Sequence, residues 1–213
     1  MECKQVISKT LNAFYNHLAR LKLKNKDFSI ISNSCWGGVV YHKLKLPFLS
    51  PFINLDFDDK DFYKLAANLR YYMSLDLQPV HGLEKFPTAY LGDILLRFVH
   101  YKTDEEAFSK WEERKNRIKY DNLFFLTSDR PNGDKIVQDD DIRSLKDVAC
   151  KGRVVFTVRD IPDCDYLIRL PKDESGDFVN IYMLDHTPFL NRWQWEYHFD
   201  YIHWLNTGIV KQL

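Results

Sequence analysis

The sequence predicts an α/β fold, a three-layer Rossmann-like sandwich with a mostly parallel sheet and a possible antiparallel pair. Short apolar runs typical of buried strands alternate with segments of helical periodicity, which is the order that builds a parallel sheet. The 213 residues contain no repeat, linker or low-complexity tract, so we expect a single domain over residues 1–213. Hydrophobic residues make up 45% of the chain and Gly and Pro number only 8 each, which excludes a disordered or fibrous protein.

The chain opens with an amphipathic helix over residues 4–24. One apolar stripe follows it, formed by Val6, Ile7, Leu11, Phe14, Tyr15, Leu18 and Leu21. Residues 27–32 then predict a short buried strand. The loop at 33–38 must turn sharply, and its paired glycines allow a positive φ there. A short helix over residues 39–44 completes this first unit.

The next unit starts with a second predicted strand over residues 52–57. Asp58 or Asp59 caps the helix that follows. The apolar positions of that helix are Phe62, Leu65, Leu69, Tyr72 and Met73. From Ala89 onward the pattern changes to alternation and predicts a strand over residues 93–101, and the region 89–101 is the source of the possible antiparallel pair.

The second half of the chain continues the alternation. Thr103 and Glu106 have the spacing of a capping box, and they open a helix that reaches Ile118. The remaining elements are a buried strand at 123–126, a polar loop at 128–135, a short helix at 140–148, strands at 154–158 and 166–170, and a last helix at 192–206. Gly208 follows that helix as its C-cap.

Charge and cysteine content restrict the class of protein. Lysine and arginine together number 30, as do aspartate and glutamate, and this balance argues against a nucleic-acid binder. No window approaches the roughly 18 consecutive apolar residues of a spanning helix, and the first residues lack the apolar core of a signal peptide. None of the four cysteines forms a Cys-x-x-Cys pair, so we expect a cytoplasmic protein with reduced thiols.

Ligands of parallel α/β sheets bind beyond the carboxyl ends of the strands. That rule selects the loops at 33–38, 56–59, 100–103, 127–132 and 158–163. In the first loop, Asn33 and the residues after it can aim backbone N–H groups at a phosphate or carboxylate, without G-x-G-x-x-G or Walker spacing. Cys35 could serve as a nucleophile if a helix N-terminus or basic neighbour lowers its pKa. Alternatively, Cys35 and Trp36 pack in the core and the glycines only form the turn.

Carboxylates and histidines supply further candidates. Asp56 and Asp58 have the Asp-x-Asp spacing that can hold a divalent cation and a sugar diphosphate, but helix capping by Asp58 or Asp59 explains the pattern better. The seven histidines show no zinc-ligand spacing, so we expect no metal. His100 at a strand end is either a general base or a structural histidine. Asp93 points to the opposite face of the predicted strand and cannot pair with His100 through strand geometry.

Basic and aromatic groups complete the candidates. Arg114 and Arg117 lie on a helical stripe that could bind a phosphate or an acidic sugar, although glutamates along the helix can pair with them. Asp129 and Arg130 open the loop after a predicted strand, where turn chemistry is the alternative explanation. The C-terminal aromatic run is best explained as core, with a pocket or partner surface as the alternative. Its members are Trp193, Trp195, Tyr197, Phe199, Tyr201 and Trp204.

Several motifs are spread over nearly the whole chain. They are Ser-Asn-Ser-Cys-Trp-Gly-Gly at 32–38, Leu-Gly-Asp-Ile at 91–94, His-Tyr at 100–101, Trp-x-x-Arg-x-x-Arg-Ile at 111–118, Asp-Asn-Leu-Phe-Phe at 121–125, and the closing motifs at 199–201 and 204–206. Together they resemble a bacterial domain family of undefined activity that is commonly labelled exopolysaccharide-biosynthesis protein. The resemblance implies a layered α/β fold and a setting in capsule or lipopolysaccharide synthesis, and it brings no established reaction. It carries over as candidates Asn33, Cys35, Trp36, Gly37, Gly38, Asp93, His100, Arg114 and Arg117.

From the loop at 33–38 and the resemblance, we expect a transferase of surface-polysaccharide assembly that acts on a nucleotide-activated sugar; the cofactor stays open. Backbone N–H groups of residues 35–38 would hold the diphosphate, and His100 or Asp93 would deprotonate the acceptor hydroxyl. The candidate catalytic residues are His100, Asp93 and Asp129, and the candidate substrate-binding residues are Asn33, Ser34, Cys35, Trp36, Gly37, Gly38, Arg130, Arg114 and Arg117. One alternative is an acyltransferase that decorates the polysaccharide through Cys35 or His100. Another is a non-catalytic partner in a polysaccharide assembly complex.

Overall fold

A four-stranded parallel sheet forms the centre of the computed structural model, which describes residues 2–129, 136–171, 184–187 and 190–213. Its strands lie in the order β1 (Ser29–Ser32), β5 (Leu123–Ser128), β6 (Gly152–Thr157) and β7 (Leu167–Arg169). β1 and β5 are fully buried and β6 nearly so, as expected for a sheet covered on both faces, whereas the edge strand β7 is only partly buried. The prediction of an α/β fold with a parallel sheet flanked by helices is confirmed.

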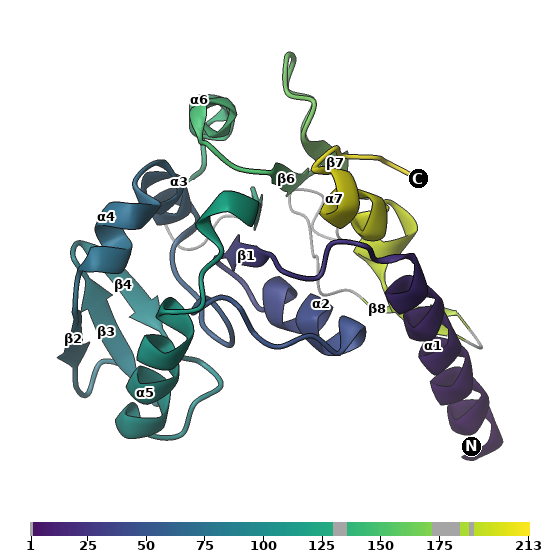
Figure 1. Cartoon of the computed structure of the whole chain (residues 1–213), viewed down its shortest axis with the longest axis horizontal. Helices are drawn as coiled ribbons and strands as arrows, with labels where there is room; N and C mark the ends of the chain where they lie inside the picture. The colour runs from purple at the N-terminus through teal and green to yellow at the C-terminus, as the bar shows by residue number, and fades with distance from the viewer. Residues whose placement is uncertain (1, 130–135, 172–183, 188–189) are drawn as a thin grey trace.

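The antiparallel part is a separate sheet of three strands. It consists of β2 (Leu77–Val80), β3 (Thr88–Leu91) and β4 (Ile94–Arg97), in that order. The turn between β3 and β4 contains Gly92 with φ +62, and a Cβ at this position would lie 2.9 Å from Leu75 Cδ1. Figure 1 shows this sheet with α5 (Asp104–Lys115) at one end of the molecule and α1 (Glu2–Lys22) at the opposite end.

Side chains of the parallel strands alternate between two faces, and each face builds its own core. Ile30, Phe124 and Phe156 join a core with α2 (Trp36–Leu44) and α7 (Tyr201–Thr207). The opposite core contains Ile31 and Phe125, together with residues of the antiparallel sheet. Helices contributing to that side are α3 (Asp59–Ala67), α4 (Leu69–Ser74), α5 and α6 (Asp139–Ser144). The remaining elements are η1 (Tyr120–Asn122), η2 (Leu145–Asp147), the hairpin of β8 (Leu184–Thr187) and β9 (Leu190–Trp193), and η3 (Gln194–Tyr197).

Aromatic rings fill the core beneath α2 and α7. The ring centroid of Trp36 lies 5.1 Å from that of Trp195 and 6.0 Å from that of Trp204. Trp204 in turn meets Phe124 of β5 edge to face at 4.8 Å. All of these side chains are buried. The interpretation of Trp195 and Trp204 as core residues is therefore confirmed, and Trp36 packs in the same core.

Two predicted elements are wrong. Residues 52–57 form no strand, and only a single β-bridge pairs Asp56 with Arg97. The predicted helix at 192–206 is helical only in α7, because β9 and η3 occupy its first part. Two predicted caps are confirmed: the Glu106 N–H donates to the Thr103 hydroxyl at 3.2 Å, which is one half of the predicted capping box, and Gly208 ends α7 with φ +82.

The described part of the chain contains no helix that combines the length and the apolar character needed to cross a membrane.

Candidate functional site

Polar side chains meet at the carboxyl edge of the parallel sheet. Asn33 directly follows β1 and is 2% exposed. The Thr127 hydroxyl of β5 donates a hydrogen bond of 3.0 Å to Asn33 Oδ1, and Asn33 Nδ2 donates to the carboxylate of Asp59 at the start of α3. One asparagine thus joins the ends of two neighbouring strands to a helix N-terminus, at the edge that the strand-end rule selects.

A second polar group lies where β5 and β6 end. Asp129 Oδ2 accepts hydrogen bonds from the Thr157 hydroxyl and from Arg159 Nε, the latter at 2.9 Å. Arg159 also donates to Asp139 at 2.7 Å. The Asp129 side chain is only 3% exposed, so these charge-assisted bonds compensate the burial of its charge.

Two buried polar atoms of this edge have no hydrogen-bond partner among the described residues. They are Asp129 Oδ1 and the hydroxyl of Tyr63. Burial raises the pKa of Tyr63 well above its ordinary value, and the negative charges of Asp59 and Asp129 raise it further. Tyr63 therefore stays a neutral hydroxyl that can donate, while Asp129 offers an acceptor oxygen.

Cys35 and His100 form the most reactive combination at the edge. The distance from Cys35 Sγ to His100 Nε2 is 3.2 Å. Cys35 is the N-cap residue of α2, and His100 lies just beyond β4, so the contact joins the two sheets. Burial raises the pKa of the Cys35 thiol, and the nearby negative charge of Asp56 raises it too. The thiol is therefore protonated at neutral pH and sits within reach of a base.

The first backbone N–H groups of α2 also lie at this site. Cys35 makes no side-chain cap hydrogen bond, and the first turn of α2 contains no acidic residue. Such a helix end can stabilise a negative charge with its first N–H groups. Gly37 and Gly38 lie within α2 without a positive φ, which corrects the explanation given for them from the sequence. A Cβ on Gly37 would lie 3.3 Å from Ile30 Cγ2, so close packing of α2 on β1 is the physical reason for this glycine.

The Asp-x-Asp pair faces an arginine. Arg97 forms an ion pair with Asp58, and its Nη1 lies 3.8 Å from Asp56 Oδ2. Asp58 occupies the N-cap position of α3, but its side chain makes no cap hydrogen bond. Asp58 therefore occupies the predicted cap position of α3, but its carboxylate pairs with Arg97 instead of capping the helix. Over the described ranges, no group of three or more His, Cys, Asp or Glu could hold a metal ion.

Three predicted site residues lie elsewhere. Asp93 is exposed in the β3–β4 turn, where Lys64 and Tyr72 donate to it at 2.8 and 2.9 Å. Arg114 is buried, donates to the Tyr101 hydroxyl at 2.6 Å and stacks on Phe48. Arg117, two residues beyond α5, pairs with Glu113 of that helix. Intramolecular partners hold all three, and none contacts the Cys35–His100 pair.

The other predicted residues fall on or beside the edge. Ser34 bonds with Ser32 at the end of β1, at 3.0 Å between hydroxyl oxygens. Arg130 lies outside the described residues. The sequence reasoning did not single out Thr157, Arg159 or Tyr63. Thr157 and Arg159 could have been found, because they lie at the end of a predicted strand, whereas Tyr63 carries no signal beyond its place in an amphipathic helix.

Comparison with known proteins gives two matches that extend over nearly the whole chain. A family model described as a domain of unknown function (DUF1919) matches residues 6–206. An uncharacterized protein of Haemophilus influenzae is 30% identical over 207 residues, which are 95% of this chain and 96% of that protein. The family match includes β1, β4 and β5, and with them every residue of the polar edge described above.

Proposed function

The chain belongs to the DUF1919 family, and we propose that it is a transferase in which the thiol of Cys35 carries the transferred group. The observation that carries this proposal is the 3.2 Å contact between Cys35 Sγ and His100 Nε2. A thiol with an imidazole at this distance can lose its proton as it attacks. Among groups that enzymes transfer, an acyl group suits such a thiol because the two form a thioester.

The proposed reaction proceeds in two steps. In the first, His100 Nε2 takes the Cys35 proton while Sγ attacks the carbonyl carbon of an activated acyl donor, and the leaving group departs with that proton. In the second, an acceptor hydroxyl gives its proton to His100 and its oxygen attacks the thioester. The hydroxyl then carries the acyl group, and the proton returns to Cys35. Negative charge that develops on the carbonyl oxygen in each step would face the first N–H groups of α2.

The resting state of Cys35 follows from its raised pKa. Burial and Asp56 both disfavour the thiolate, so Cys35 rests as a neutral thiol. His100 must then act as a general base during the attack. The proposal therefore assigns catalysis to two residues and makes each of them necessary.

A sugar hydroxyl is the acceptor that the rest of the edge supports. Asp129 Oδ1 and the Tyr63 hydroxyl are buried polar atoms that make the interior of this edge polar, which favours a polar acceptor. The resemblance to proteins labelled for exopolysaccharide biosynthesis points to the same chemical class. We therefore propose a surface-polysaccharide sugar as the acceptor and transfer of an acyl group as the decoration.

The test uses 4-nitrophenyl acetate, an activated ester that needs no knowledge of the natural donor. The wild-type protein should release a burst of one nitrophenolate per chain, and Cys35→Ser should abolish the burst. His100→Ala should slow it by at least about 100-fold, the usual contribution of a general base. Cys164→Ser, at another half-buried cysteine, is the matched control and should keep the burst. Equal reaction in the wild-type and Cys35→Ser proteins would overturn the proposal.

A second candidate function is transfer of a sugar from a nucleotide donor, with His100 as the base for the acceptor. The specific observation in its favour is the N-terminus of α2, which lacks both a side-chain cap and an acidic first turn and could receive a diphosphate. Cys35→Ser distinguishes the two candidates, because a backbone phosphate site survives that substitution. A thermal shift with UDP, GDP or CMP that persists in Cys35→Ser would favour transfer of a sugar from a nucleotide donor.

A further inference from the structure

Helix α1 exposes an apolar stripe on its outer side. Ile7, Phe14 and Leu21 are 39%, 56% and 68% exposed, and they recur every seven residues. Leu11 and Leu18 are half-buried and lie between them on the same side. We call these five residues the outer face of α1. A helix that served only to cover the sheet would turn its largest apolar side chains inward. The exposed outer face therefore indicates that α1 binds a further surface.

The opposite side of α1 fixes the helix to the body. Ala19 packs against the core beneath α2, and Arg20 donates to the Lys43 carbonyl oxygen at 2.9 Å. The Asn206 side chain holds the C-terminal end of α1, since its Nδ2 donates to the Lys22 carbonyl oxygen at 3.0 Å. Figure 1 shows the N-terminal end of α1 pointing away from the rest of the molecule. The outer face is thus held in a fixed orientation and is open to a partner.

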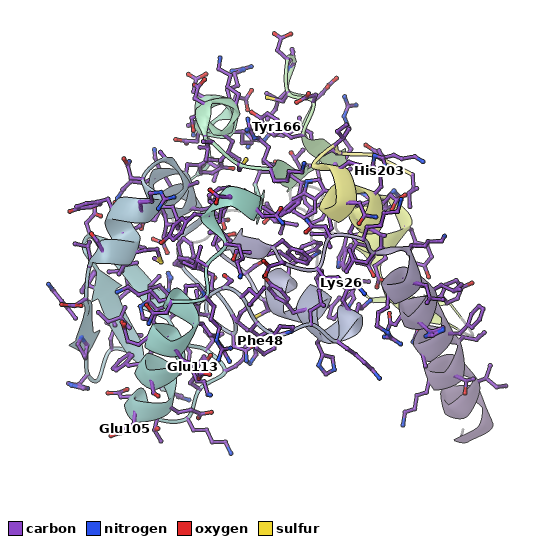
Figure 2. The ribbon with its side chains drawn as sticks, in the orientation of Figure 1. Lys26, Phe48, Glu105, Glu113, Tyr166 and His203 are labelled. Atoms are coloured by element: carbon purple, nitrogen blue, oxygen red, sulfur yellow. The ribbon has the colours of Figure 1, made fainter. Side chains whose placement is uncertain are left out.

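Charge around α1 is mostly positive. Residues 2–27, which comprise α1 and the segment directly after it, contain six of the 30 lysines and arginines of the chain and only two of its 30 aspartates and glutamates, Glu2 and Asp27. The whole chain is neutral, so the remainder is acidic. Lys22, Lys24 and Lys26 are exposed and make no ion pair with any residue in the described ranges. Figure 2 shows Lys26 beyond the C-terminal end of α1, toward the body.

We propose that the outer face of α1 docks on an anionic lipid surface. Exposed large apolar residues next to unpaired cations are the features of a helix that lies in the plane of a membrane interface. The apolar side chains would enter the boundary of the acyl region, and the lysines would meet the negative headgroups. The charge around α1 favours an anionic lipid surface over a second copy of the chain as the ligand of this face. Two copies paired through α1 would bring their cations together with only Glu2 and Asp27 to compensate them, and Asp27 already pairs with Lys119.

The test is co-sedimentation of the full-length protein with vesicles. Vesicles of equal parts phosphatidylcholine and phosphatidylglycerol should bind the protein, and phosphatidylcholine vesicles should not. Phe14→Ser/Leu21→Ser should abolish binding, and Lys24→Glu/Lys26→Glu should weaken it by at least about 25-fold, at roughly five-fold for each lysine lost. Exposure of all four side chains means that these variants keep the fold, which circular dichroism checks.

Matched controls carry the same changes at exposed positions away from α1. Ile209→Ser removes a side chain that is 65% exposed, and Lys85→Glu/Lys146→Glu reverses two exposed lysines. Both should bind anionic vesicles like the wild type. Equal binding to neutral vesicles, or no binding to either kind, would overturn the proposal. So would light scattering that shows a dimer in the wild type and a monomer in Phe14→Ser/Leu21→Ser, because a second copy would then cover the outer face.

Discussion

Asn33 shows how single side chains organise the polar edge. Its amide accepts from Thr127 and donates to Asp59, and all three residues are buried. An amide suits this position because it combines an acceptor and a donor in one plane. A hydrophobic residue of the same size would remove both of these hydrogen bonds from the buried interior.

Asn33→Leu should therefore lower the free energy of unfolding by about 2 kcal/mol or more, the cost of leaving buried polar groups without their hydrogen bonds. Urea denaturation measures the change. Asn116→Leu replaces an exposed asparagine at the end of α5 and serves as the control, with an expected change within about 0.5 kcal/mol. Equal changes in the two variants would show that the Asn33 network contributes nothing to stability.

The raised pKa of Cys35 predicts how the thiol reacts with alkylating agents. Because a raised pKa delays thiolate formation, the alkylation rate should rise only as pH passes above the ordinary thiol value of about 8.5. Asp56→Asn removes the second cause of the shift and should move the profile to lower pH. Mass spectrometry of the Cys35 peptide after iodoacetamide treatment reports the rate. A plateau reached below neutral pH would mean that Cys35 and His100 rest as an ion pair.

The sequence singles out Cys35 and His100 but does not predict that they meet. They are separated by 65 residues and follow strands of different sheets. The strand-end rule selected both loops as parts of one parallel sheet, but His100 follows a strand of the antiparallel sheet, for which the rule predicts no common edge. Asp93 was also misplaced. The alternating pattern predicted that it lies in a strand, but it lies in the β3–β4 turn, where Lys64 and Tyr72 donate hydrogen bonds to it.

At the scale of elements, periodicity predicts the long helices and the buried strands of the parallel sheet. The prediction of a strand at residues 52–57 was wrong because apolar side chains that alternate with polar ones also occur in an irregular segment packed in a core. Phe52, Leu55 and Phe57 are fully buried there without strand partners on both sides. β2 was missed because it is a short edge strand with Pro79 inside it, which lowers any strand signal.

Gly208 ends α7 at a position that only glycine satisfies. Its φ is +82, and a Cβ there would lie 2.0 Å from the Lys151 carbonyl oxygen. Gly208→Ala should thus destabilise the protein by at least about 2 kcal/mol, from backbone strain and from the clash together. Gly82→Ala is the matched control, since Gly82 has φ +76 but nothing within 4 Å of the added Cβ. Its cost should stay near 1 kcal/mol, the strain alone. Thermal unfolding of both variants measures the difference.

At the scale of the molecule, the two sheets share one core. Ile31 and Phe125 of the parallel sheet belong to the same buried cluster as Leu91 and Leu96 of the antiparallel sheet. The Cys35–His100 contact depends on this shared core, because Cys35 lies between β1 and α2 of one sheet layer and His100 follows β4 of the other sheet. A change that loosens one sheet from the other should therefore reduce activity without touching either residue.

A shared core predicts that the molecule unfolds in a single transition. Trp111 reports on the antiparallel side, and Trp36, Trp195 and Trp204 report on the side of α2 and α7. Urea unfolding followed by tryptophan fluorescence and by far-UV circular dichroism should give coincident curves. Two separated transitions, or a Trp111→Phe variant whose fluorescence curve loses only one of them, would show that the two sheets fold independently.

The central claim is that His100 activates Cys35 as the nucleophile of a transferase. The most direct measurement is peptide mass spectrometry after a brief exposure to 4-nitrophenyl acetate and an acid quench. We expect one acetyl group on the Cys35 peptide of the wild type and its loss in His100→Ala, while Cys150 and Cys164 remain unmodified. Acetylation spread evenly over the cysteines, or unchanged on Cys35 without His100, would contradict the claim.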